Sequence, residues 1–234
     1  MTKWLKQTLH HSFKGHCHLC GLSIESDENE GIWCQHCRTL FNPEPRCATC
    51  GLPNVINVER CGQCISTPPP WHRLYCVGDY QAPLDHYIHQ MKFNRKFWYA
   101  RDLAELLAPR ILEPAQIITS VPLHWHRQLE RGYNQSDHLA KALCGHLSIS
   151  NRYNPNLFER TRPTKAQRDL SKRERQINLV DAFKLKSVPQ ESHVAIVDDV
   201  VTTGSTIRHL CQLLLEVGVE KIDIYCICRT PEPS

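Results

Sequence analysis

Long hydrophobic runs are absent from this chain of 234 residues. A membrane-spanning helix needs about 18 or more consecutive apolar residues, and no such run occurs. The first residues, Met1–His11, also lack the continuous apolar region of a secretory signal. We therefore expect a cytoplasmic protein without a transmembrane segment, whose residues 1–16 form a tail that could contain a short helix.

Two further absences limit the functional classes. No Gly-Lys pair occurs in the sequence, whereas the nucleotide-binding loop of P-loop ATPases requires one. Neither sign of charge dominates, and a net charge of +4 does not by itself indicate a nucleic-acid partner. The content of hydrophobic residues, 41%, and of charged residues, 22%, is typical of an ordinary globular protein.

Cysteine, in contrast, is abundant, with 13 residues. Eight of these cysteines form four C-x-x-C pairs within the first 64 residues. Two such pairs supply the four thiolates of a tetrahedral zinc site, so the sequence predicts two structural zinc ions. The predicted ligands are Cys17, Cys20, Cys34, Cys37, Cys47, Cys50, Cys61 and Cys64.

The spacing leaves open how the four pairs combine. Successive pairs could share an ion, or the pairs could interleave. A redox-active C-x-x-C motif would need a surrounding βαβ pattern, which is missing here. The other five cysteines are expected to bind no metal, because most lie in apolar strand or helix patterns where cysteine behaves as a small hydrophobe. They are Cys76, Cys144, Cys211, Cys226 and Cys228.

The composition changes after the last cysteine pair. Residues 17–65 are predicted to form a double zinc ribbon, and the proline-rich residues 66–70 a stiff linker. Residues 71–234 suffice for one α/β domain. Strands are expected at 74–77, 116–121, 182–185, 194–197 and 222–227, and helices at 83–93, 97–112, 134–147 and 207–215. This alternation predicts a parallel sheet with helices on both faces.

The most informative stretch is Val194–Thr206, with the sequence VAIVDDVVTTGST. Four apolar residues predict a buried strand, and Asp198 and Asp199 follow at its carboxyl end, where open α/β sheets hold ligands. A loop around Gly204 then opens a helix that Gly218 is expected to cap. Backbone N–H groups at such a helix N-terminus bind phosphate. Adjacent carboxylates can accept hydrogen bonds from two sugar hydroxyls.

This stretch resembles the phosphoribosyl-diphosphate (PRPP) motif of type I phosphoribosyltransferases. The resemblance implies that Asp198 and Asp199 hold the ribose hydroxyls. It also implies a 5′-phosphate site formed by Thr202, Thr203, Gly204, Ser205 and Thr206. A buried strand followed by a solvated acidic turn is the alternative. A Walker B strand is excluded because the chain has no P-loop.

Two basic segments precede the motif in sequence. Arg127 and Arg131 follow the strand predicted at 116–121, and their planar guanidinium groups suit a diphosphate. Between residues 152 and 175, eight basic and three acidic residues give a local charge of +5. This second segment fits a lid that closes Lys165 or Arg168 over an anionic ligand, but a solvated loop or a nucleic-acid contact would have a similar composition.

The chain resembles the ComF/GntX family over nearly its whole length. The resemblance rests on the cysteine pairs and on VPLHWHRQLERGYNQSDHLA, RTRPTKAQRDLSKRERQINLVDAF and VAIVDDVVTTGST, which follow one another in that order. It implies a double zinc ribbon ahead of a phosphoribosyltransferase-like domain. It also implies a cytoplasmic role in natural competence and in the use of external DNA, with PRPP and Mg²⁺ as ligands.

The sequence leaves three classes of function open. In a phosphoribosyltransferase, Asp198, Asp199 and Arg131 would be the catalytic residues, with an unknown acceptor. A non-catalytic protein could bind single-stranded DNA through its basic segment. In an adaptor, the zinc ribbons would dock onto a DNA-translocation ATPase.

Overall fold

The computed structural model describes residues 15–24, 32–123, 129, 131–161 and 182–230. Contacts divide the chain into two compact units, Met1–Pro43 and Glu44–Ser234. The described part of the first unit contains α2 (Gln35–Arg38) and the 3-10 turn η1 (Thr39–Phe41). No helix in the described ranges is both long and apolar enough to cross a membrane.

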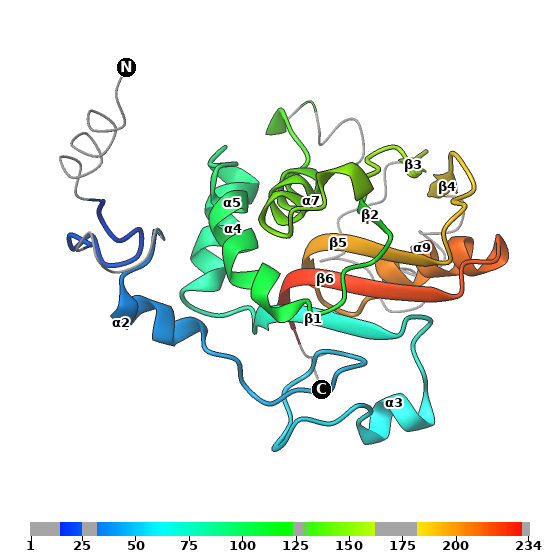
Figure 1. Cartoon of the computed structure of the whole chain (residues 1–234), viewed down its shortest axis with the longest axis horizontal. Coiled ribbons are helices and arrows are strands. Elements are labelled where there is room, and N and C mark those ends of the chain that lie inside the picture. Colours follow the sequence, from blue (N-terminus) through cyan, green and yellow to red (C-terminus); the bar gives the residue numbers. More distant parts are fainter. Residues whose placement is uncertain (1–14, 25–31, 124–128, 130, 162–181, 231–234) are drawn as a thin grey trace. The chain divides into compact units, whose positions relative to one another are not determined.

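The second unit contains the sheet and most of the helices (Figure 1). Its strands within the described residues are β1 (Arg73–Gly78), β2 (Ile117–Ser120), β3 (Phe158–Arg160), β4 (Phe183–Leu185), β5 (His193–Val201) and β6 (Lys221–Arg229). Its α-helices there are α3 (Gly62–Ser66), α4 (Leu84–Phe93), α5 (Tyr99–Leu107), α7 (Gln135–His146) and α9 (Ser205–Glu216). Short 3-10 turns η2 (Ala108–Arg110) and η3 (Ser150–Arg152) complete this part.

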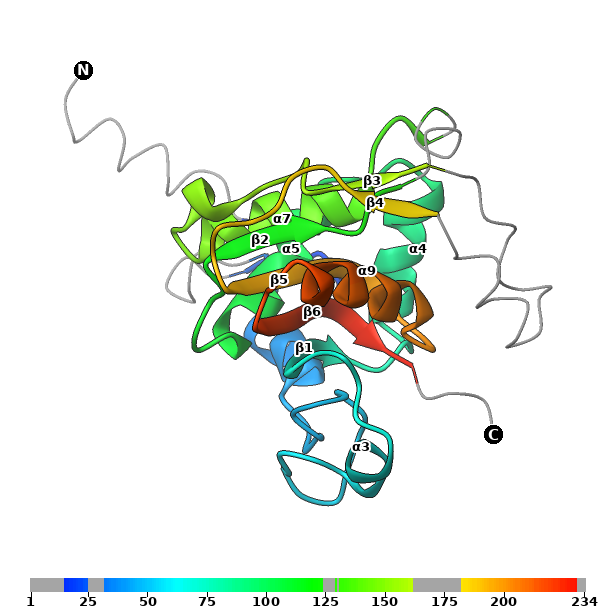
Figure 2. The same cartoon turned by 90° about the vertical axis from the view of Figure 1, so that its right-hand side faces the viewer.

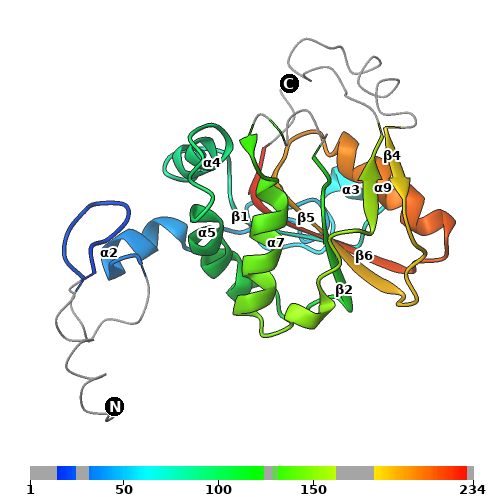
Figure 3. The same ribbon diagram turned by 90° about the horizontal axis from the view of Figure 1, so that it is seen from above.

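The central sheet has the strand order β1-β6-β5-β2 among the described residues, and all its pairings are parallel. The two middle strands are buried on both faces, as their unbroken runs of apolar residues predict. Figure 3 shows α5 and α7 on one face of this sheet and α9 on the other. The predicted α/β class, a parallel sheet covered by helices on both faces, is therefore confirmed.

The helix after the acid pair forms because its apolar residues recur on one face. Ile207, Leu210 and Leu214 of α9 are buried against Ile196 and Ile224 of the sheet. The helix ends at Glu216, and Gly218 caps it as predicted. Gly218 has a φ of 92°, and its N–H and the next one donate to the carbonyls of residues 215 and 214.

Three predicted elements differ from those observed. The helix expected at 97–112 stops at Leu107, because Pro109 cannot continue the hydrogen-bond ladder and a 3-10 turn follows. The strand at 182–185 exists as β4, but it lies outside the main sheet. It pairs antiparallel with β3, a strand that the sequence analysis missed (Figure 2).

The third difference concerns the strand predicted at 194–197. Observed β5 continues to Val201, so the acid pair lies within the strand and not after it. Its neighbour β2 ends at Ser120, opposite Val197. Beyond that point, within the described part of the chain, β5 pairs with β6 alone. The missing neighbour leaves the acid pair beside open space at the carboxyl edge of the sheet.

The cysteines of residues 47–64 belong to the same compact unit as the sheet. The N–H of Leu74 in β1 donates to the carbonyl of Ala48 at 2.9 Å, so part of the β1 edge is covered. Gly51 has a φ of 73°, and a Cβ there would lie 2.4 Å from Leu74 Cδ2. The double ribbon at 17–65 and the linker at 66–70 stay predictions, because compactness alone does not define folding domains.

Candidate functional site

A cavity of about 550 Å³ lies at the carboxyl edge of the sheet, and we call it the edge cavity. It is bounded by the acid pair, by residues 121–123 after β2, by the start of α7 and by the start of α9. Ligands of open α/β sheets bind at this edge. The cavity is therefore the candidate ligand site.

Asp198 is half-buried and points toward the start of α7. Its Oδ1 accepts hydrogen bonds from Ser136 Oγ and from the N–H of Asp199, both at 2.9 Å. Burial and the negative charge of Asp199 raise the pKa of the Asp198 carboxyl to about 7, and Lys92 and Ser136 offset part of this rise. An empty cavity therefore holds an Asp198 that is partly protonated at neutral pH.

Asp199 is buried and forms an ion pair with Lys92. The distance from Lys92 Nζ to Asp199 Oδ2 is 2.7 Å. Burial opposes the charge of Lys92, but the attraction of Asp199 outweighs it, and the pKa of Lys92 is raised. Lys92, near the end of α4, was missed by sequence reasoning because it lies more than a hundred residues from its partner. The sequence pattern around Lys92 carries no signal of this pairing.

The segment Thr202–Thr206 connects β5 to the first turn of α9. We call it the phosphate loop, after the ligand that the sequence predicts for it. Gly204 has a φ of 69° and is the N-cap of α9, so its backbone suits a residue without a Cβ. The loop is held internally, because Thr203 Oγ1 donates to Ser205 Oγ at 3.1 Å. All its residues except Thr203 line the edge cavity. The predicted loop-to-helix geometry is present, and the N–H groups at the start of α9 belong to the cavity wall.

The start of α7 is built by the sequence RGYNQS, residues 131–136. Asn134 caps the helix by accepting from the N–H of Ser136, and its amide donates to the carbonyl of Val121 after β2. Tyr133 donates to the carbonyl of Met91 in α4. Because of these bonds, Ser136 lies within reach of the acid pair.

Three basic side chains line the edge cavity among the described residues: Lys92, Arg131 and Arg160. Arg131 donates to Gln135 at 3.0 Å and lies over the ring of Phe93. Arg160 stacks on Phe183, which joins the β3–β4 pair to the cavity wall. Arg160 was not predicted as a site residue, because sequence reasoning missed β3. Arg127, Lys165 and Arg168 lie outside the described residues.

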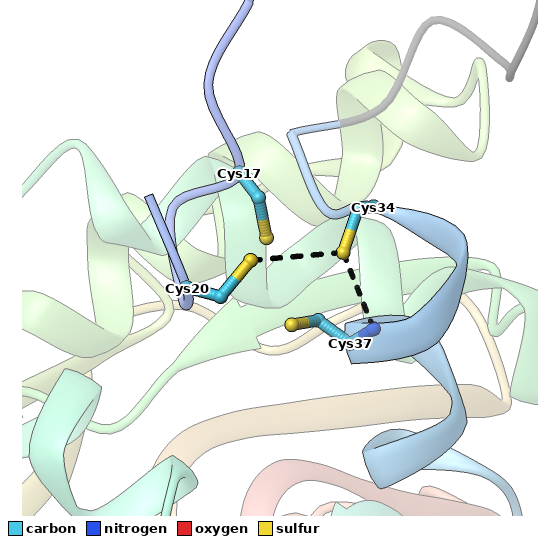
Figure 4. Close-up of side chains that lie close together, drawn as sticks. All are labelled: Cys17, Cys20, Cys34 and Cys37. Carbon is cyan, nitrogen blue, oxygen red and sulfur yellow. Dashed lines mark hydrogen bonds between the residues drawn. The ribbon is translucent and has the colours of Figure 1, made fainter. Parts of the chain in front are cut away.

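The cysteines form two clusters in chain order. The first cluster is Cys17, Cys20, Cys34 and Cys37, and the second is Cys47, Cys50, Cys61 and Cys64. Within each cluster the Sγ atoms lie within 4.8 Å of one another. Figure 4 shows the sulfurs of the first cluster gathered around one centre. The structure thus groups successive C-x-x-C pairs, and not interleaved ones.

The sulfur separations fit a tetrahedral zinc site. A Zn–S distance of about 2.3 Å places the sulfurs of a tetrahedron about 3.8 Å apart. The Sγ atoms of Cys20 and Cys34 are 3.8 Å apart, and those of Cys50 and Cys61 are 3.7 Å apart. Burial opposes ionisation of Cys17, but backbone hydrogen bonds from Cys20 and Cys34 outweigh it and lower its pKa to about 6. Both clusters could hold zinc.

Comparisons with known proteins agree with this geometry. Residues 131–234 match the phosphoribosyl transferase domain family. The DNA utilization protein YhgH of Escherichia coli (strain K12) is 40% identical over 227 residues, which cover 92% of this chain and 97% of the relative. Competence protein F of Haemophilus influenzae is 36% identical over 207 residues, or 84% of this chain and 90% of the relative.

The chain belongs to the ComF/GntX family.

A more distant relative is competence protein ComFC of Streptococcus pneumoniae, which is 21% identical over 234 residues, or 91% of this chain and 99% of the relative. The matches to YhgH and ComFC each cover more than nine-tenths of the chain. The match to the phosphoribosyl transferase domain includes the acid pair, the phosphate loop and Arg131. Family membership therefore accounts for the presence of cysteine clusters and a phosphoribosyltransferase-like domain in one chain.

Proposed function

We propose that this protein binds PRPP with Mg²⁺ in the edge cavity and acts in the uptake or use of external DNA. The observation that carries the proposal is that the acid pair and the phosphate loop line one cavity. PRPP carries vicinal ribose hydroxyls and a 5′-phosphate. A carboxylate pair next to a helix N-terminus is complementary to both features.

Each group in the cavity has a role under this proposal. Asp198 and Asp199 accept hydrogen bonds from the ribose 2′ and 3′ hydroxyls, and the phosphate loop binds the 5′-phosphate. Arg131 lines the same cavity, where it can approach the diphosphate, and Arg127 with Lys165 or Arg168 extends this cationic set. Mg²⁺ bound to the substrate diphosphate needs few protein ligands, and Asp198 and Asp199 are the carboxylates among the described residues that line the cavity.

Catalysis would require these residues to stabilise positive charge. When diphosphate leaves C1 of PRPP, the ribose ring becomes cationic, and the nearby carboxylates favour that state. Arg131 would stabilise the departing diphosphate, and Ser136 and Lys92 would hold the carboxylates in place. The chemistry is therefore orientation and charge stabilisation, with an acceptor still to be identified.

We further propose that the two cysteine clusters bind structural zinc. A Cys₄ site is coordinatively closed, so neither ion would take part in catalysis. Among the described residues, the apolar side chains at the first cluster are Ile24 and Leu19, and Trp33 and Phe41 are the other large apolar side chains buried in this unit. Metal binding would therefore supply most of the free energy that folds this segment.

The DNA role rests on the relatives and on charge. Relatives are named for DNA utilization and competence, and residues 152–175 carry a charge of +5. The second candidate is therefore a non-catalytic protein of the cytoplasm that binds single-stranded DNA or adapts a translocation ATPase to it. Arg152 and Arg160 are the basic residues of this segment that the structure describes.

The PRPP proposal is tested by calorimetric titration with Mg²⁺-PRPP. The double variant Asp198→Asn, Asp199→Asn removes both charges while keeping the size of the side chains. Hydrogen bonds to charged groups contribute on the order of 1.5–3 kcal/mol each, so we expect at least about a tenfold loss of affinity. Unchanged affinity in a folded double variant would place the PRPP site elsewhere. Glu191→Gln, at the opposite edge of the sheet, is the control and should bind like the wild type.

The DNA candidate is tested with a quadruple variant of Lys165, Arg168, Lys172 and Arg173 to Gln. Log affinity for single-stranded DNA falls with log salt by about 0.7 per phosphate contact. If the segment contacts DNA, the variant should bind more weakly and with a shallower salt dependence. If the segment closes over PRPP instead, the variant should lose PRPP affinity and keep its DNA binding. If the variant keeps the DNA affinity and the salt dependence of the wild type, the segment does not contact DNA.

A further inference from the structure

The knuckle between the first two ligands of the second cysteine cluster, Cys47-Ala-Thr-Cys50, presents two carbonyl groups to the sheet. Thr49 O accepts a hydrogen bond from the indole Nε1 of Trp71 at 2.8 Å. Cys50 O accepts one from Nε of Arg229 at 2.9 Å. Both donors are buried, with exposed fractions of 5% and 6%. Each of these two side chains also contacts the phosphate loop or the residue before it, and we call the two sets of contacts the two routes.

Arg229 forms the first route. It is the last residue of β6, and its Nη1 donates to the carbonyl of Val201 at 3.2 Å and also to that of Thr202. Val201 ends β5, and Thr202 begins the phosphate loop. One guanidinium group therefore joins the knuckle to the point where the loop leaves the sheet. Its planar, rigid donor set fixes several carbonyls at once.

Trp71 forms the second route. The far end of its ring lies beneath Gly204, where an added Cβ would be 3.1 Å from the Trp71 Cη2 atom. The guanidinium of Arg208, in the first turns of α9, lies 5.2 Å from the centre of the same ring. The indole thus supports the phosphate loop from below while its N–H is bonded to the knuckle.

We propose that the second cysteine cluster, once it holds zinc, positions the phosphate loop through Trp71 and Arg229, so that zinc binding there and PRPP binding are coupled. The coupling follows from the position of the two carbonyls. One belongs to Thr49, between the two ligands, and the other to Cys50, itself a ligand, so both are fixed when Cys47 and Cys50 share an ion. Trp71 and Arg229 are positioning residues, since neither lines the edge cavity. This inference rests on the proposed binding of PRPP.

Coupling between two sites is reciprocal, and this gives a test that needs no enzyme assay. The zinc-loaded full-length protein is brought to equilibrium with a chromogenic chelator, and the zinc transferred to the chelator is measured with and without saturating Mg²⁺-PRPP. We expect PRPP to tighten the binding of one of the two ions by about fivefold or more. Mg²⁺ alone should not tighten it. The variant Cys34→Ser, Cys37→Ser, which lacks the first cluster, should retain the protected ion.

Variants separate the two routes from general stability. Arg229→Met should still bind two zinc ions but show weaker PRPP binding and little protection, and Arg229→Lys should recover part of both. Trp71→Phe loses the bond to Thr49 and the outer part of the ring that contacts Gly204, so it should lose part of the protection. Arg152→Met is the matched control. Its guanidinium also donates to backbone carbonyls, those of Pro114 and Ala115 at the opposite sheet edge, and it should behave as the wild type.

The outcomes are distinct. If the wild type binds PRPP but the affinities for both zinc ions are unchanged, the coupling is wrong and the PRPP proposal stands. Equal protection in the wild type and in Arg229→Met and Trp71→Phe would also refute the two routes. If the wild type does not bind PRPP, both proposals fail. The wild-type comparison decides the coupling even if Arg229→Met does not fold.

Discussion

At the scale of single residues, the ionisation of Asp198 links stability to pH. Its raised pKa, about 7, means that the folded protein retains a proton that the unfolded chain releases near pH 4. Stability should therefore fall as pH rises between about 4 and 7, by on the order of 1 kcal/mol per pH unit from this group. The charged groups that act on the Asp198 carboxyl are Asp199 and Lys92.

The variant Asp198→Asn checks this prediction. Asn keeps an oxygen that accepts from Ser136 and from the N–H of Asp199, but it does not titrate. Urea unfolding at pH 5 and pH 7 should show a smaller loss of stability in the variant than in the wild type. An identical pH dependence in both proteins would show that Asp198 is charged throughout.

The pair of Lys92 and Asp199 gives a second prediction at this scale. Lys92→Met leaves a buried carboxylate without its cation and should destabilise the fold by about 3 kcal/mol. Adding Asp199→Asn should recover most of that loss, because the uncompensated charge is gone. Chemical denaturation of the two single variants and the double variant measures the coupling. Additive effects would contradict a direct ion pair.

At the scale of elements, the phosphate loop depends on Gly204. Gly204→Ala should destabilise the protein by about 1–2 kcal/mol through its positive φ, and by more because its Cβ meets Trp71 at 3.1 Å. Gly218→Ala is the matched control, because its φ is also positive but nothing lies within 4 Å of its Cβ. The midpoint temperature of thermal unfolding should be lower for Gly204→Ala than for Gly218→Ala. Only Gly204→Ala should weaken PRPP binding.

The sequence predicted the elements that carry strong local patterns. The strands β5 and β6 were found because their apolar residues form continuous runs, and the helix α9 because its apolar residues recur with the helical period. The strand β3 was missed because three residues carry too short a pattern. The length of α5 was overestimated because Pro109 was given too little weight against the apolar face. The sequence alone did not show that the acid pair lies inside β5, since this depends on where β2 ends.

The candidate site was predictable where its residues are neighbours in the chain. Asp198, Asp199 and the phosphate loop form one continuous motif. Lys92, Arg160 and Arg229 come from distant elements, and their positions follow only from the packing of α4, β3 and β6. Long-range partners of this kind leave no period or spacing in a single sequence.

At the scale of the whole molecule, metal content is the simplest quantity to measure. Two closed Cys₄ sites predict about two zinc ions per chain, measured by atomic emission on purified protein. Cys17→Ser should reduce the content to about one, whereas Cys211→Ser should leave it at two, because Cys211 lies on the buried face of α9, in the core beneath the sheet. A metal content near zero with oxidised cysteines would contradict the zinc proposal.

The pairing of β1 with β6 has a consequence for synthesis on the ribosome. These strands are the first and last of the central sheet along the described chain. All residues between them must therefore be synthesised before the two strands can pair. Until then β5 has an exposed edge on that side, rich in valine and isoleucine. A chain truncated before Lys221 should therefore aggregate in cells. Nascent chains should need protection until the final strand has emerged, whatever happens at the cysteine clusters.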